Sequence, residues 1–207
     1  MDSNTQTKIR CAVITGGNKG IGFEICRQLA SSGISIALTS RDATKGLEAI
    51  EKIKISFGLS IIVFHQLDYI HIGGAMSALG YECLQTNYYG VKLVTEALIP
   101  LLQLYDSPRI VNVTSTMGML KVVFNVNALE ILSDGDGLKE ESVDEMVNMF
   151  LKYFKEDLME SKGWPSCLPD HIISKASLDA YTRILTKQFP DFHINYVMVG
   201  SRQIFAL

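Results

Sequence analysis

The octapeptide Thr15-Gly16-Gly17-Asn18-Lys19-Gly20-Ile21-Gly22 decides the fold class of this chain of 207 residues. It follows a short apolar run, residues 10–15, that is typical of a strand buried on both faces. Apolar residues then recur at helical spacing over residues 21–29. Glycines in such a turn let the backbone approach a pyrophosphate, and the following helix offers free N–H groups and the positive end of its dipole.

The alternative interpretation of this octapeptide is an ordinary glycine-rich turn. Because a strand precedes it and a helix follows it, we favour a nucleotide-binding turn. The residues expected to contact the nucleotide are Gly16, Asn18, Lys19, Gly20, Ile21 and Gly22.

The alternation of strand and helix continues outward from this turn. We expect a strand at residues 34–39, a helix at Ala43–Phe57 and a strand at residues 60–66. Strand, helix, strand, helix, strand is the mononucleotide-binding half of a doubly wound parallel sheet.

The second half of the chain repeats this pattern. Residues 79–105 are expected to be mostly helical, with Pro100 kinking or interrupting the helix. Strands are expected at residues 109–114 and at His193–Val199, with a helix at residues 172–189 between them.

One further amphipathic helix is expected over residues 143–158. Its apolar residues recur at helical spacing, which indicates a core-facing stripe. Ser142 and Glu145 have the spacing of a capping box at its start.

The end of the second expected strand indicates which dinucleotide binds. Arg41 stands where an acidic residue would favour NAD, and Lys45 lies one helical turn further on. Both cations suit the 2′-phosphate of NADP(H), although both could also be solvated surface residues. Asp68, after the third strand, either contacts the adenine or caps a turn.

Four polar residues form a candidate catalytic set. Ser115 lies just past a strand, Asn87 lies on an earlier helix, and His171 and Lys175 are i and i+4 on one helix face. Each has a structural alternative: a turn cap for Ser115, solvation for Lys175 and a helix-start position for His171.

The composition excludes several classes of protein. The net charge is −3 and 47% of residues are hydrophobic, so no basic excess indicates nucleic acid or an anionic membrane as a partner. No apolar run approaches the ~18 residues of a membrane helix, and the polar residues 1–7 are unlike a signal peptide. The four cysteines and four histidines lack disulfide or metal-ligand spacing, so we expect a cytoplasmic protein with reduced thiols and no metal.

At these residues the sequence resembles the short-chain dehydrogenase/reductase family. Four segments carry the similarity: residues 15–22, 86–90 (T-N-Y-Y-G), 109–118 (R-I-V-N-V-T-S-T-M-G) and 174–183 (S-K-A-S-L-D-A-Y-T-R). Within the family, the chain looks like the plant branch that contains salutaridine reductase and the menthone and isopiperitenone reductases. The resemblance covers nearly the whole chain except for residues 69–78 and the last residues.

The resemblance implies hydride transfer between NADP(H) and a carbonyl or alcohol. It implies that Ser115 orients the carbonyl oxygen and that Asn87 holds a water of the proton relay. Lys175 matches the lysine that binds the nicotinamide ribose and lowers the pKa of the catalytic acid. The helical insertion, at about residues 125–164, is expected to cover the substrate cleft and to block the usual oligomer interface, which implies a monomer.

The chain departs from the family pattern at the catalytic acid. His171 replaces the tyrosine of the family's Y-x-x-x-K, and Tyr181 cannot substitute, because it lies about 240° around the helix from the face of Lys175. Lys175 and an oxidised nicotinamide both disfavour a charged imidazole, and a neutral imidazole is a poor acid. Losing a positioned acid costs ~10²–10⁴ in rate, so a reaction that needs the acid less, such as reduction of an activated C=C bond, should suffer less.

The chain also departs from the family in length. Between Asp68 and the helix that begins near residue 79 there is no room for a crossover helix, although residues 69–72 could form a stub of strand. The family's central fourth strand, its N-N-A-G motif and its C-terminal segments have no counterpart. The strand at residues 109–114 must then pair with the first strand, or a gap remains.

The expected fold is therefore α/β, a single domain over residues 1–207 with a doubly wound (Rossmann-like) parallel sheet that is incomplete and carries a helical insertion. The expected function is an NADPH-dependent oxidoreductase that acts on a small-molecule ketone or enone of plant alkaloid or terpenoid metabolism. The alternatives are a non-catalytic relative that still binds NADPH or a full-length paralogue, and a chain without a stable native state.

Overall fold

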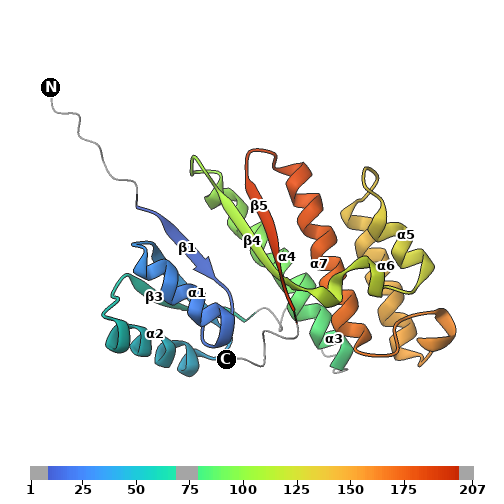
Figure 1. The fold of residues 1–207 in the computed structure, drawn as a ribbon, viewed down its shortest axis with the longest axis horizontal. Coiled ribbons are helices and arrows are strands. Elements are labelled where there is room, and N and C mark those ends of the chain that lie inside the picture. The colour runs from blue at the N-terminus through green and yellow to red at the C-terminus, as the bar shows by residue number, and fades with distance from the viewer. Residues whose placement is uncertain (1–8, 69–78, 201–207) are drawn as a thin grey trace. The chain divides into compact units, whose positions relative to one another are not determined.

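The computed structural model describes residues 9–68 and 79–200 (Figure 1). The chain forms two compact units, which we call the first unit (Met1–His71) and the second unit (Ile72–Leu207). That they form one domain, with an insertion at residues 125–164, stays a prediction.

The first unit is a parallel three-stranded sheet in the order β1 (Cys11–Ile14), β2 (Ser35–Ser40), β3 (Ile62–Gln66). Helix α1 (Gly20–Ser31) connects β1 to β2, and helix α2 (Ala43–Phe57) connects β2 to β3. This is the expected strand–helix alternation. Helix α2 has the predicted bounds, because the Asp42 side chain accepts a hydrogen bond from the Lys45 backbone N–H at its start and Gly58 adopts a left-handed conformation at its end.

The two helices of the first unit cover one face of its sheet. Ile36 and Leu38 of β2 are buried against the helices together with Ile53 of α2. On the opposite face Val13 and Val63 are 46% and 64% exposed. Neither helix of the first unit covers this second face, so the prediction that the first strand is buried on both faces is wrong within that unit.

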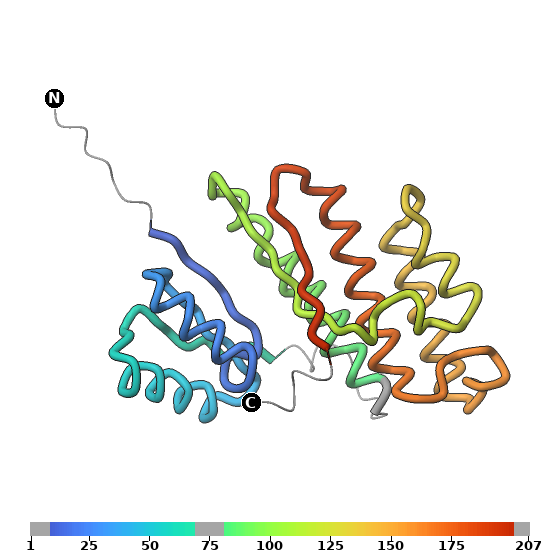
Figure 2. Tube along the Cα trace, viewed as in Figure 1, coloured from blue at the N-terminus to red at the C-terminus, as the bar shows by residue number. Residues whose placement is uncertain are grey.

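The second unit contains a two-stranded parallel sheet, β4 (Arg109–Ser115) and β5 (His193–Val199). Helix α7 (Pro169–Gln188) lies between this sheet and helices α5 (Val126–Ser133) and α6 (Glu140–Lys155) (Figure 1). Figure 2 shows the chain leaving α7 and turning back into β5, which runs beside β4.

The expected helix over residues 79–105 is three consecutive elements in the structure. Helix α3 (Leu79–Leu84) passes into a π-helix, η2 (Gln85–Tyr89), and then into α4 (Gly90–Leu102). Pro100 lies inside α4, so it does not interrupt the helix, whereas the predicted alternative of a kink stays a prediction. A proline near the C-terminal end of a helix removes only one hydrogen bond of the last turns, and the helix continues for two more residues.

The predicted amphipathic helix is α6, and its stripe faces the core of the second unit. Val143, Met146, Val147 and Phe150 are buried, and the ring of Phe150 lies 5.2 Å from that of Trp164. The capping box is wrong, because the helix begins at Glu140 rather than after Ser142. Two glutamates in its first turn suit the positive end of the helix dipole.

A charged network ties α6 to α4. Lys92 Nζ lies 2.6 Å from Glu140 Oε1 and 2.6 Å from Asp144 Oδ2. The Tyr88 hydroxyl donates to Asp144 Oδ1 at 2.8 Å. Since the Lys92 side chain is only 13% exposed, this network is screened less than a surface ion pair.

Short elements complete the second unit. Three 3₁₀ turns were not predicted from the sequence: η3 (Thr116–Gly118), η4 (Leu120–Val122) and η5 (Glu160–Lys162). The predicted stub at residues 69–72 lies outside the described residues. The described strands form two parallel sheets, and no described strand pairs with both β1 and β4, which fits an incomplete Rossmann-like fold.

Candidate functional site

The glycine turn between β1 and α1 has a backbone that only glycine fits well. Gly16 and Gly20 have φ values of +63° and +55°, in the left-handed region. A Cβ atom on Gly22 would lie 2.5 Å from the carbonyl oxygen of Gly16, and one on Gly17 would lie 2.6 Å from Leu38 Cγ. The turn is therefore closely packed at two positions and left-handed at two others.

Backbone hydrogen bonds anchor this turn to β2. The Gly17 N–H donates to the Thr39 carbonyl at 2.9 Å, and the Thr39 hydroxyl donates to the Ile14 carbonyl at 3.2 Å. Lys19, the residue before α1, makes no capping hydrogen bond through its side chain. The first turn of α1 contains no acidic residue. Its first N–H groups and the positive end of its dipole thus suit a phosphate, and the absence of side chains on the glycines leaves room for one.

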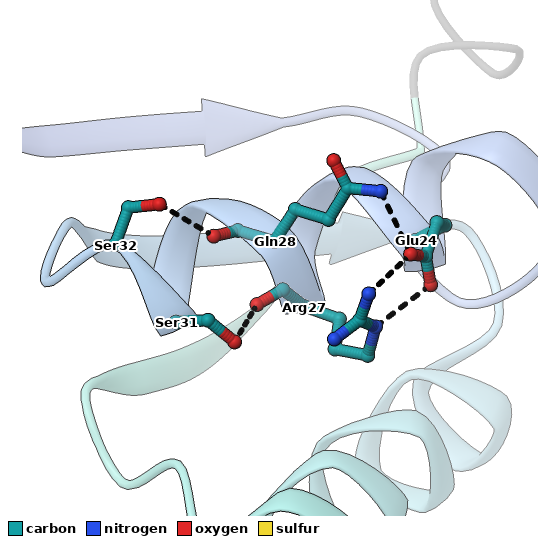
Figure 3. Close-up of polar contacts among 5 residues, drawn as sticks. All are labelled: Glu24, Arg27, Gln28, Ser31 and Ser32. Carbon is teal, nitrogen blue, oxygen red and sulfur yellow. Dashed lines mark hydrogen bonds and ion pairs between the residues drawn. The ribbon is translucent and has the colours of Figure 1, made fainter.

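Polar side chains along α1 are engaged in contacts within the helix (Figure 3). Arg27 and Gln28 both donate hydrogen bonds to the Glu24 carboxylate, at 2.9 Å from Arg27 Nε and 2.8 Å from Gln28 Nε2. These hydrogen bonds lower the pKa of Glu24 to about 2. The Ser31 and Ser32 hydroxyls donate to carbonyls one turn earlier. Glu24, Arg27 and Gln28 are thus engaged with one another, which leaves the helix start as the part of α1 suited to a ligand.

The cations expected to select NADP(H) differ in their partners. Lys45 Nζ lies 3.1 Å from Asp42 Oδ2. Arg41 is exposed at the end of β2 and makes no ion pair with another described residue. Its guanidinium is therefore better suited than Lys45 to hold a phosphate. Asp68 is exposed two residues after β3, and its predicted contact with adenine stays a prediction.

In the second unit, Lys175 of α7 reaches β4, the strand that ends at Ser115. The Ser115 Oγ atom accepts a hydrogen bond from the Met117 N–H at 3.2 Å, so Ser115 does cap a turn. Gly118 of that turn packs closely on α7, where a Cβ would lie 2.9 Å from the carbonyl carbon of Lys175. Lys175 Nζ donates to the Val113 carbonyl at 3.1 Å. Lys175 is thus a half-buried cation beside the strand end that carries Ser115.

Asn87 lies on the π-helix and faces the first turns of α7. Its Nδ2 atom donates to Ser174 Oγ at 3.2 Å and lies 3.3 Å from Cys83 Sγ. The Ser174 hydroxyl donates in turn to the His171 carbonyl at 3.0 Å. π-Turns recur at functional sites, and this one directs Asn87 towards the helix that carries His171 and Lys175.

His171 is half-buried on the first turn of α7. Burial, followed by the positive charge of Lys175, lowers the pKa of His171 below its ordinary value, while Asp170 opposes this shift. The prediction that Lys175 disfavours a charged imidazole is therefore confirmed. Burial also lowers the pKa of Lys175. Tyr181 is 1% exposed and meets the ring of Tyr88 edge-on, so it is a core residue and no substitute for the missing tyrosine.

Two side chains of this cluster, Cys83 and Ser174, were not predicted to have a role. Ser174 belongs to one of the segments that carry the family resemblance, so its position was a usable signal. Cys83 had no such signal, because its contact with Ser174 joins residues 91 positions apart.

Among the described residues, no helix combines the length and hydrophobicity needed to cross a membrane. The same residues contain no group of three or more His, Cys, Asp or Glu side chains that could hold a metal ion.

A parallel sheet whose first strand leads through a glycine turn into a helix is typical of a Rossmann-like fold, the fold class in which dinucleotides bind at this turn. The family model of short chain dehydrogenases matches residues 10–70. Salutaridine reductase from Papaver bracteatum is 47% identical over 260 residues, covering 95% of this chain and 83% of that protein. The (-)-isopiperitenone reductase of Mentha piperita is 37% identical, covering 92% and 83%. This chain therefore belongs to the short-chain dehydrogenase/reductase family and is an oxidoreductase by ancestry.

Solved structures show the same relationship. Salutaridine reductase from Papaver somniferum superposes with a TM-score of 0.86 at 46% identity, covering 91% of this chain and 85% of that one. Menthone neomenthol reductase from Mentha piperita superposes with a TM-score of 0.85 at 36% identity, covering 92% and 89%. The predicted resemblance to this plant branch is confirmed.

The comparison also supports the predicted shortening. The alignment with the Papaver bracteatum protein spans 260 residues, whereas 95% of this chain is fewer than 200, so about 60 aligned positions have no counterpart here. A loss of that size is enough for a strand and a crossover helix.

Proposed function

We propose that this chain is an NADPH-dependent reductase of a small ketone or enone in plant alkaloid or terpenoid metabolism. The observation that carries the proposal is the glycine turn of the first unit, where a Cβ on Gly22 would lie 2.5 Å from the carbonyl oxygen of Gly16. Within the second unit, the hydrogen bond from Lys175 to the Val113 carbonyl of β4, the strand that ends at Ser115, supports it separately. The relatives named for the reduction of salutaridine, isopiperitenone and menthone support the choice of substrate class.

Several residues of the first unit fit the cofactor. The turn over residues 16–22 would hold the pyrophosphate through backbone N–H groups, because its glycines leave no side chain in the way. Arg41 would bind the 2′-phosphate, and Lys45 would contribute less because Asp42 already pairs with it. Asp68 would approach the adenine. When bound, NADPH supplies the hydride.

The remaining chemistry falls to residues of the second unit. Lys175 would bind the nicotinamide ribose through its amino group, and Ser115 would donate a hydrogen bond to the oxygen of the substrate. Asn87 would hold a water molecule near α7. His171 remains neutral near pH 7 because burial and Lys175 both disfavour its charged form.

A neutral His171 favours an enone over a simple ketone as substrate. Reduction of a ketone places negative charge on oxygen and needs a proton there, and losing a positioned acid costs ~10²–10⁴ in rate. When hydride adds to the C=C bond of an enone, the charge is delocalised over the enolate, and water can deliver the proton later. The Ser115 hydroxyl and the neutral imidazole N–H would then act as hydrogen-bond donors to the enolate oxygen.

The experiment measures NADPH binding and turnover separately in the purified chain. We expect NADPH to raise the melting temperature more than NADH does, and Arg41→Ala to remove that preference. Turnover on matched ketone and enone substrates should favour the enone, and His171→Tyr should restore ketone reduction. Unchanged enone reduction in His171→Ala would contradict a role for His171.

A second function, NADPH binding without catalysis, is favoured by one observation: His171 stands where the family has its catalytic tyrosine. A chain that binds NADPH without turning over any ketone or enone would be a non-catalytic relative, and His171→Tyr would leave it inactive. A melt without a cooperative transition, indifferent to NADPH, would contradict both functions.

We further propose that the chain is a cytoplasmic monomer. All four cysteines are free thiols, which suits a reducing compartment. Sedimentation of the purified chain at several concentrations tests the monomer.

A further inference from the structure

We propose that Asp179 is a positioning residue that holds the charged amino group of Lys175 against the Val113 carbonyl. The inference rests on the proposed function, in which Lys175 binds the cofactor. It assigns a role to a buried carboxylate that neither the glycine turn nor the catalytic set uses.

Asp179 occupies an unusual position for a charged residue. It lies on α7 one turn after Lys175 and one turn before Arg183, so the three side chains follow one stripe of the helix. Asp179 is only 8% exposed, and the neighbouring Thr114 hydroxyl of β4, a residue 2% exposed, partly opposes the rise of its pKa. The Asp179 Oδ1 atom and the Thr114 hydroxyl both lack a well-formed hydrogen bond among the described residues. A buried carboxylate held in this way is costly, which calls for a functional explanation.

The two cations beside Asp179 are not equally available to it. Arg183 donates to the Leu132 carbonyl, which draws its guanidinium towards the end of α5. Lys175 donates only to a neutral acceptor, the Val113 carbonyl, and pairs with no carboxylate among the described residues. Asp179 is therefore the acidic group whose field can keep Lys175 charged.

The other groups that act on Lys175 support this assignment. Burial disfavours the charged amine, whereas Cys83 on α3 and Asp179 on α7 favour it. Burial raises the pKa of Cys83, so that thiol is neutral near pH 7. His171 is the remaining titratable group on the same stripe of α7, and its pKa is lowered, so it is neutral there as well. Asp179 is then the group whose negative charge offsets the burial of Lys175.

The test titrates Lys175 itself. In the isotope-labelled chain without cofactor, the ¹³Cε resonance of Lys175, assigned with Lys175→Arg, reports its protonation. We expect Asp179→Asn, which keeps the shape and removes the charge, to lower the pKa of Lys175 by roughly one pH unit. The matched control Asp136→Asn removes an exposed carboxylate that lies 3.8 Å from Lys187 and should leave Lys175 unchanged. An unchanged Lys175 titration in folded Asp179→Asn overturns the proposal.

A second measurement needs no variant. Burial raises the pKa of Asp179 to about 6, so the Lys175 resonance of the native chain should show a second, smaller inflection near that pH. A resonance that is flat through this range overturns the proposal even if Asp179→Asn fails to fold.

Cofactor affinity provides a third readout and separates the two proposals. We expect Asp179→Asn to weaken NADPH binding about 2- to 10-fold, the equivalent of one hydrogen bond. If the native chain binds no NADPH, the proposed function fails, while the Lys175 titration still decides the role of Asp179.

Discussion

Replacing Asp179 by asparagine should stabilise the chain at neutral pH and not in acid. Burial raises the pKa of this carboxyl from 3.8 to about 6, so the folded state favours the protonated form. The carboxyl group therefore destabilises the fold least below pH ~4; the destabilisation grows between pH ~4 and about 6 and stays constant above that range. About two pKa units correspond to ~3 kcal/mol at pH 7 and above.

The measured gain should be smaller than this limit, because a buried asparagine amide also lacks partners. We expect Asp179→Asn to raise the free energy of unfolding by ~1–3 kcal/mol at pH 7.5 and by little at pH 4. Urea unfolding followed by the fluorescence of the chain's single tryptophan gives this value, since Trp164 is 3% exposed in the core of the same unit. Asp136→Asn is the control and should change stability by less than ~1 kcal/mol at both pH values. A gain of equal size at pH 4 and pH 7.5 would refute the reasoning, because ionisation would then not be its source.

Three further predictions concern other parts of the chain. Gly22→Ala should abolish NADPH binding in fluorescence titration, because its Cβ would lie 2.5 Å from a carbonyl oxygen, while Gly135→Ala, with open space around it, should bind normally. Tyr88→Phe should lower the free energy of unfolding by ~1–2 kcal/mol, since it removes the 2.8 Å hydrogen bond to Asp144, and no loss in urea unfolding would show that Lys92 compensates fully. Phe150→Ala should cost ~3–5 kcal/mol, because this side chain is 0% exposed, whereas Ile55→Ala, at 80% exposure, should stay within ~0.5 kcal/mol, and equal losses would contradict the core described above.

The sequence predicted those elements whose ends carry local signals. Helix α2 has an aspartate cap and a terminal glycine, and both predicted bounds agree with the structure. Strand β5 is a compact apolar run and also has its predicted bounds. Helix α5 was missed, since its eight residues are too short to show a clear period.

Elements that depend on distant contacts were predicted less well. The π-helix was missed because periodicity analysis assumes 3.6 residues per turn throughout, and the hydrogen bond from Asn87 to Ser174 joins residues far apart in the chain. The capping box at Ser142 has the right composition, but the helix begins earlier, where two glutamates also suit a helix start.

The candidate site shows the same division. The motifs located Ser115, Asn87 and Lys175. In the structure Lys175 lies on α7, Asn87 donates a hydrogen bond to Ser174 of α7, and Ser115 precedes the turn whose Gly118 packs on α7. Asp179 was overlooked although it stands four residues after Lys175, because only the packing of α7 on β4 shows that its carboxylate is buried. A charged residue on the apolar face of a helix therefore indicates a functional position only once the strand that packs against that face is known.

The π-helix at Gln85–Tyr89 has a consequence for how this chain is aligned with its relatives. A π-turn holds one residue more than an α-turn, and each residue of an α-helix advances the side-chain direction by about 100°. The side-chain directions of α3 and α4 are thus out of phase. Helix α3 packs mainly on α7, whereas Lys92 of α4 reaches α6. Deleting a single residue here would restore regular geometry and rotate Lys92 away from both of its carboxylates. The side-chain directions of α3 and α4 are therefore set separately. A one-residue gap at this segment, in an alignment with a relative, would mean that different side chains of α4 face α6 in that relative.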